Sequence, residues 1–117
     1  FMASRYKHSP RVVGFDLRNE LRPSSHGSPT WGGGDARTDW LIAAHKASDR
    51  VVAANSGMLI VVSALISGMF LCDVPKHPLH LQDPEFADRM VYTSHEYIMT
   101  SVHLQIRMLL GKMVGPL

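Results

Sequence analysis

The strongest constraint on the fold comes from two short apolar segments in which polar and apolar residues do not alternate. Residues 11–17 read RVVGFDL and residues 58–65 read MLIVVSAL. Continuous runs of this kind, rich in β-branched residues, are typical of strands covered on both faces, as in parallel sheets. A third segment, MVYTSHEY at residues 90–97, also has the composition of a strand. We therefore expect three strands in one parallel sheet.

A helix is expected between the first two strands. Residues 39–55, DWLIAAHKASDRVVAAN, repeat apolar side chains at steps of three and four. Thr38 is a suitable N-cap residue, and Asn55 with Gly57 is typical of a helix end. The positions expected to face the core are Trp40, Ala44, Ala47, Val51 and Ala54.

The rest of the chain completes an alternating pattern. Residues 66–89 contain three prolines and have room for one short helix before the third strand. The order strand, helix, strand, helix, strand indicates an α/β fold with a parallel sheet. With 117 residues, the chain is long enough for one domain.

Composition excludes several classes of function. Hydrophobic residues make up 45% and charged residues 19%, as in an ordinary globular protein. The net charge is +2 and the basic residues are dispersed, so no nucleic-acid partner is expected. Residues 51–72 are uncharged and long enough to span a bilayer, but the turn signal NSG at 55–57 interrupts them, so no membrane partner is expected. Cys72 is the only cysteine, which excludes an internal disulfide and a cysteine metal cluster.

Polar side chains follow the first and third predicted strands. Asn19 and Glu20 come after the first strand, and His95 and Tyr97 close the third. Because the carboxyl ends of parallel strands meet at one edge, we expect these four side chains to gather there. Strand alternation places His95 and Tyr97 on one face and turns Glu96 to the other.

Ordinary structural roles remain open for the same residues. Glu20 can instead pair with Arg18 or Arg22, or cap a neighbouring helix. Tyr97 can pack in the core with its hydroxyl hydrogen-bonded. The sequence alone does not decide between these roles and a functional site.

Trp31 lies in the polar loop PTWGGG, and its role can be interpreted in two ways. We expect an exposed indole that stacks on the apolar face of a sugar; the alternative is an indole that anchors its own loop. The glycines at 32–34 lack the ending of a phosphate-binding loop. His77 and His80 are three residues apart but surrounded by prolines, so neither a metal site nor a cofactor is expected.

Four segments in this order resemble the central part of a glycoside hydrolase family 5 enzyme, a cellulase-like endoglucanase. They are VVGFDLRNE, PTWGGGDARTDWLIAAHKASDRVVAAN, LIVVSAL and RMVYTSHEY. The resemblance covers about residues 5–97 and implies a partial (β/α)8 TIM barrel, with about strands four to six and their connecting helices. Residues 1–97 would form the central part of the catalytic barrel. Residues 98–117 would be an atypical C-terminal tail, with a helix predicted over 103–113.

The resemblance also implies an activity and a role for each site residue. Members of this family hydrolyse O-glycosyl bonds of β-linked polysaccharides such as cellulose by a retaining mechanism with two glutamates. Glu20 would be the general acid/base, and Asn19 would bind the sugar 2-hydroxyl beside the scissile bond. His95 and Tyr97 would orient the sugar and the nucleophile, whereas substrate binding by Trp31 is expected only from its place in the polar loop. The nucleophile would be a glutamate at the end of strand seven, outside these 117 residues.

Some features depart from the family. Many relatives have Glu-Gly where this chain has Ser63-Ala64, which would remove a polar contact near the site. The parent family is secreted, whereas the first residues of this sequence show no signal-peptide pattern. Two alternatives therefore stand beside the hydrolase: a non-catalytic fragment with weak carbohydrate binding, and a small free-standing α/β binding domain.

Overall fold

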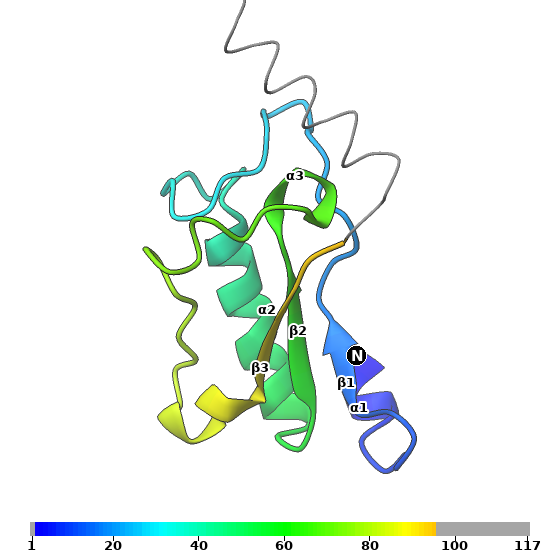
Figure 1. Ribbon diagram of the computed structural model, residues 1–117. Helices are drawn as coiled ribbons and strands as arrows, with labels where there is room; N and C mark the ends of the chain where they lie inside the picture. The colour runs from blue at the N-terminus through cyan, green and yellow to red at the C-terminus, as the bar shows by residue number, and fades with distance from the viewer. Residues whose placement is uncertain (1, 96–117) are drawn as a thin grey trace, which may run out of the picture.

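The computed structural model describes residues 2–95, and Figure 1 shows their arrangement. The expected three-stranded parallel sheet is present, with the strands in the order β1-β2-β3. The strands are β1 (Gly14–Asp16), β2 (Leu59–Ser63) and β3 (Met90–Thr93). The helices are α1 (Met2–Arg5), α2 (Trp40–Ala54), α3 (Leu65–Gly68) and the 3-10 helix η1 (Pro84–Arg89). The predictions for Glu96, Tyr97 and the helix over 103–113 lie outside the described residues.

Each strand is shorter than its predicted segment, because regular pairing covers only part of that segment. In β1, the ladder still extends one residue beyond each end. The Leu59 amide donates to the Val13 carbonyl at 2.9 Å, and the Leu17 amide donates to the Val61 carbonyl at 3.0 Å. An ideal Cβ at Gly14 would lie 2.7 Å from the Leu59 carbonyl oxygen, so a glycine permits the close approach of β1 to β2.

Helix α2 covers one face of the sheet, where the core lies. The sheet residues on this face are paired in register, Phe15 with Ile60 and Val62 with Tyr92. Ile60 and Val62 are fully buried. The buried row of α2 is Trp40, Ala44 and Ser48, so Ser48 takes the central place that the pattern gave to Ala47.

The start of α2 corrects the predicted cap by one residue. Asp39, not Thr38, is the N-cap, because the Asp39 backbone is extended and forms a bridge with Thr30, whereas Thr38 lies in the turn before it. The buried Asp39 carboxylate accepts from the amides of Leu41 and Gly32, both at 3.0 Å, and of Gly34 at 2.7 Å. One carboxylate therefore holds both the first turn of the helix and the glycine loop before it.

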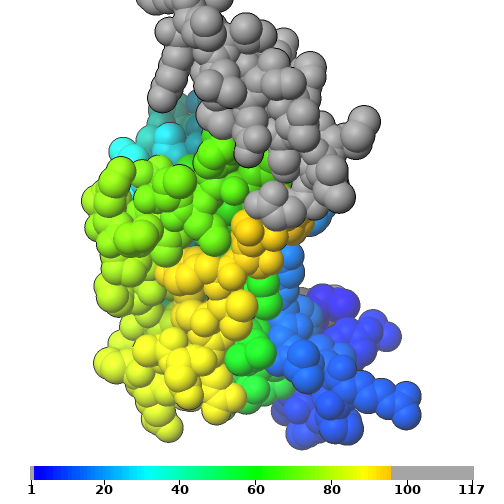
Figure 2. Space-filling model, in the orientation of Figure 1, coloured from blue at the N-terminus to red at the C-terminus, as the bar shows by residue number. Residues whose placement is uncertain are grey.

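The opposite face of the sheet faces the viewer in Figure 1, and no helix of the described residues covers it. Asp16, Val61 and Val91 are paired side by side on this face. Val91 is 39% exposed, although it is an apolar strand residue. Figure 2 shows the blue, green and gold segments that carry the three strands adjacent to one another on this side of the molecule.

The connection from β2 to β3 contains two short helical segments rather than the single one expected. Helix η1 has Pro84 in its first turn and Asp83 as its N-cap, which accepts from the Glu85 amide at 3.1 Å. Helix α3 is a single distorted turn that directly follows β2. Within residues 2–95, no helix has the length and apolar character needed to cross a membrane.

Candidate active site

Glu20 and His95 meet at the carboxyl edge of the sheet, as predicted. Glu20 follows β1 and His95 follows β3, the two strands that flank β2. The Glu20 Oε1 atom lies 3.3 Å from His95 Nδ1, although the residues are 75 positions apart in the chain. Their side chains are only 14% and 22% exposed. The pair is thus a partly desolvated carboxylate and imidazole in hydrogen-bonding distance.

Arg22 contacts the other oxygen of the same carboxylate. Its Nη2 atom lies 2.5 Å from Glu20 Oε2, so the alternative of an ion pair with Arg22 is confirmed beside the His95 contact. The Arg22 side chain is 66% exposed, which limits an ion pair of this kind to about 1 kcal/mol or less. Both carboxylate oxygens of Glu20 therefore face basic groups.

The end of β2 and the turn after it form hydrogen bonds with the segment that carries Glu20 and with His95. The sequence did not predict these contacts. The buried Ser63 hydroxyl donates to the Arg18 carbonyl at 2.6 Å. The Ser67 amide donates to the Leu21 carbonyl at 3.2 Å, and the His95 amide donates to the Gly68 carbonyl at 2.7 Å. Ser63 therefore makes a polar contact across the sheet edge, between β2 and the segment that follows β1. No residue type in this segment signals such contacts in advance.

Two other predicted site residues, Asn19 and Trp31, differ in their exposure to solvent, and Tyr97 lies outside the described residues. Asn19 is exposed to solvent next to Glu20 in the chain. Trp31 is 7% exposed, so the prediction of an exposed indole is wrong. Its Nε1 donates to the His77 carbonyl at 2.7 Å, and its ring meets Tyr92 edge-to-face at 6.2 Å. Because the indole is buried by these contacts, it is not exposed for stacking on a sugar. The alternative, an indole that anchors its own loop, is correct.

Trp31 should therefore be needed for stability rather than for binding. In a catalytic domain that carries residues 2–95, we expect Trp31→Ala to lower the free energy of unfolding by about 3–5 kcal/mol, the usual cost of removing a buried large aromatic. Trp31→Phe keeps an aromatic side chain but loses part of the buried volume and the hydrogen bond to His77, and should lower the free energy of unfolding by less than Trp31→Ala does. Denaturant unfolding measures both. A weakened affinity for β-glucan oligosaccharides with unchanged stability would contradict the anchoring role.

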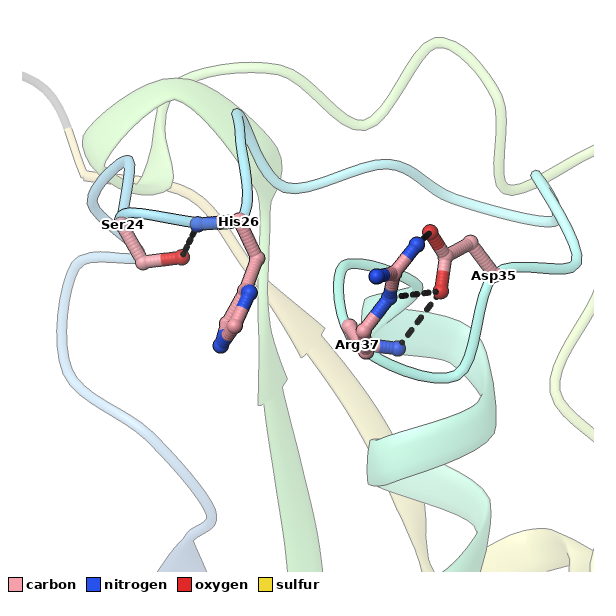
Figure 3. Close-up of polar contacts among 4 residues, drawn as sticks. All are labelled: Ser24, His26, Asp35 and Arg37. Atoms are coloured by element: carbon pink, nitrogen blue, oxygen red, sulfur yellow. Dashed lines mark hydrogen bonds and ion pairs between the residues drawn. The ribbon is translucent and has the colours of Figure 1, made fainter.

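Local ion pairs and turns hold the polar loop between Glu20 and α2, as Figure 3 shows. Asp35 accepts from Arg37 Nε at 3.1 Å, Arg37 Nη2 at 2.9 Å and the Arg37 amide at 3.0 Å. The Arg37 side chain, followed by its amide, lowers the pKa of Asp35, and Asp35 raises the pKa of Arg37. The Ser24 hydroxyl oxygen accepts from the His26 amide at 3.1 Å. The loop and the start of α2 line an open pocket of about 230 Å³, with Arg22, Arg37 and Trp40 among its residues.

The described residues offer no metal centre. Within residues 2–95, no group of three or more His, Cys, Asp and Glu side chains is placed to hold a metal ion. Cys72 is exposed. The chemistry available at the strand edge is that of the Glu20 carboxylate, the His95 imidazole and the groups that position them.

Comparisons with known proteins show which family this chain resembles. The family described as Cellulase (glycosyl hydrolase family 5) matches residues 1–108, which extends beyond Tyr97 into the segment expected to be atypical. An "Endoglucanase" of Paenibacillus polymyxa is 36% identical over 107 residues, covering 82% of this chain and 25% of the relative. The "Major extracellular endoglucanase" of Xanthomonas campestris pv. campestris is 46% identical over 65 residues, covering 56% of this chain and 13% of the relative.

A solved structure gives the same result at the level of the fold. The catalytic domain of the major endoglucanase from Xanthomonas campestris pv. campestris superposes with a TM-score of 0.67 and 35% identity. The match covers 83% of this chain and 29% of that domain. The chain thus spans a quarter or less of its curated relatives and less than a third of the solved domain. Because the family match includes nearly the whole sequence, this chain belongs to glycosyl hydrolase family 5, the cellulase family.

Proposed function

We propose that this chain supplies the acid/base side of a retaining glycoside hydrolase that cleaves β-linked glucans such as cellulose. In this proposal, residues 1–97 provide about strands four to six of a (β/α)8 barrel. Residues 98–117 would be an atypical C-terminal tail, of which the family model still matches the part up to residue 108. The substrate class and the extracellular location are taken from the relatives, one of which is named an extracellular endoglucanase.

One observation carries the proposal: the 3.3 Å contact between Glu20 and His95 at the carboxyl edge of two flanking strands. Active sites of β/α barrels are built at this edge, from residues on several strands. A carboxylate that is mostly buried yet faces a polar neighbour is suited to proton transfer. Family membership adds the reaction class, because these enzymes act on glycosidic bonds.

The proposed mechanism uses Glu20 twice. In the first step Glu20 donates a proton to the glycosidic oxygen while the nucleophile attacks the anomeric carbon, giving a glycosyl-enzyme and a free alcohol. In the second step Glu20 removes a proton from water, and that water displaces the nucleophile from the same carbon. Asn19 would bind the sugar 2-hydroxyl, and His95 and Tyr97 would orient the sugar and the nucleophile. The mechanism needs no cofactor.

The nucleophile must come from outside these 117 residues. A retaining site needs a second carboxyl group about 5–5.5 Å from the first. The uncovered face with Val61 and Val91 supports this proposal, because in a closed barrel it would pack against the interior side chains of other strands. Burial of Trp31 removes the residue on which the alternative of a weak sugar-binding fragment depended.

The test is to complete the barrel and follow the product. Residues 2–97 replace the matched segment of the Xanthomonas campestris catalytic domain, and this chimera is called the completed domain. We expect it to hydrolyse soluble β-glucan and to release the β-anomer first, as recorded by proton NMR before mutarotation. Release of the α-anomer would contradict the retaining mechanism. A folded completed domain without hydrolytic activity would contradict the proposed function.

A further inference from the structure

The turn that follows β2 has a strained backbone conformation. Three consecutive residues have a positive φ: Ile66 at 52°, Ser67 at 56° and Gly68 at 87°. This region is unfavourable for L-residues, and for a β-branched residue such as Ile66 it is an outlier. Such a conformation persists only where the surrounding structure imposes it, and such residues cluster at functional sites.

Gly68 lies directly against His95. An ideal Cβ at Gly68 would lie 3.0 Å from His95 Cγ and 3.1 Å from His95 Nδ1, closer than such contacts normally come. The Gly68 carbonyl also accepts from the His95 amide at 2.7 Å. The same Nδ1 atom is the one that lies 3.3 Å from Glu20 Oε1. The buried Gly68 thus fixes both the backbone and the ring of His95 on the side next to Glu20.

We propose that Gly68 is a positioning residue that sets the contact between His95 and Glu20. The absence of a side chain lets the imidazole approach Gly68, and the strained turn presents the carbonyl that holds the His95 backbone. Gly68 touches no substrate in this assignment and acts only through His95. Its importance for catalysis rests on the proposed function, whereas its effect on the contact itself does not.

Two glycines of the same chain serve as matched controls. Gly34 has a nearly equal φ of 82° but nothing within 4 Å of an added Cβ, so Gly34→Ala adds the backbone strain without the collision. At Gly57, an added Cβ would lie 3.4 Å from its nearest neighbour, the Asn55 side chain. In the completed domain we expect Gly68→Ala to lower kcat about tenfold or more, because small displacements of site residues are costly. Gly34→Ala and Gly57→Ala should change kcat less than about twofold.

A spectroscopic measurement separates positioning from general damage. The His95 ring signal in a carbon–proton NMR spectrum is assigned by its loss in His95→Ala. Glu20→Gln should shift this signal in the otherwise unaltered completed domain and leave it almost unchanged in Gly68→Ala. An equal shift in both backgrounds would overturn the proposal. This measurement does not depend on activity, so it decides the role of Gly68 even if the completed domain does not hydrolyse β-glucan.

A second comparison applies if Gly68→Ala does not fold. Removing the imidazole removes the collision but not the strain of the positive φ. Gly68→Ala added to His95→Ala should therefore lower the unfolding temperature only by about as much as Gly34→Ala lowers that of the unaltered completed domain. Continued failure of the double variant to fold would show that Gly68 does not act through His95, and would also overturn the proposal.

Discussion

Replacing Glu20 by alanine in the completed domain should lower the rate of β-glucan hydrolysis about 10²–10⁴-fold, the usual contribution of a general acid/base. The loss should be smaller for aryl glycosides whose leaving group needs no protonation, because only the second step then depends on Glu20. Initial rates on soluble β-glucan and on a dinitrophenyl β-cellobioside measure the two cases. Glu20→Ala with full activity on soluble β-glucan would remove Glu20 from the mechanism.

Azide provides the sharper part of this test. It needs no general base, so in Glu20→Ala it should attack the glycosyl-enzyme, restore turnover of the dinitrophenyl substrate and give a β-glycosyl azide. Glu85→Gln is the matched control, because Glu85 lies in η1 before β3, at the other end of the strand from His95. A strand of this length separates the two ends by roughly 13 Å. We expect Glu85→Gln to retain the activity of the completed domain and to show no response to azide.

The purified 117-residue chain should not hydrolyse β-glucan at all. Formation of the glycosyl-enzyme requires a nucleophile in addition to the acid/base. In the proposed mechanism Glu20 fills only the second role, and Glu85 lies at the other end of β3 from His95. Glu96, which follows His95, should point to the opposite face by strand alternation. Release of reducing sugar, measured beside the completed domain at equal concentration, should stay at the level of a blank.

One result would contradict the proposal that the nucleophile lies outside these 117 residues. Hydrolysis by the purified chain that is lost in Glu96→Gln but kept in Glu85→Gln would show that the second carboxylate is already present. Glu20→Ala of the same chain serves as the internal check, because it should abolish any hydrolysis that proceeds through the proposed site.

The features that the sequence predicted well depend on local patterns. The three strands and α2 follow from continuous apolar runs and from helical spacing, and both are visible over ten or so residues. The meeting of Glu20 with His95 followed from topology, because parallel strands bring their carboxyl ends together. The N-cap was misplaced by one residue, since Thr38 and Asp39 are both good capping residues and only the pairing with Thr30 distinguishes them.

The features that the sequence did not predict depend on distant partners or on backbone geometry. Trp31 is buried by the His77 carbonyl, 46 residues away, and by Tyr92 on β3. Neither contact leaves a trace in the loop sequence, which reads as polar and flexible. The turn at Ile66 was missed for a different reason: a β-branched residue gives no indication that its φ is positive. The contact of Ser63 with Arg18 likewise exists only once β1 and β2 are paired.

The shared carboxylate of Asp39 has a dynamic consequence. Because it accepts from Gly32 and Gly34 as well as from Leu41, the loop cannot swing away while the helix start keeps its full set of hydrogen bonds. Opening of the loop would expose the first amides of α2, and fraying of the helix would release the loop. These segments therefore form one cooperative unit, and Trp31, within the same loop, links its opening to the core.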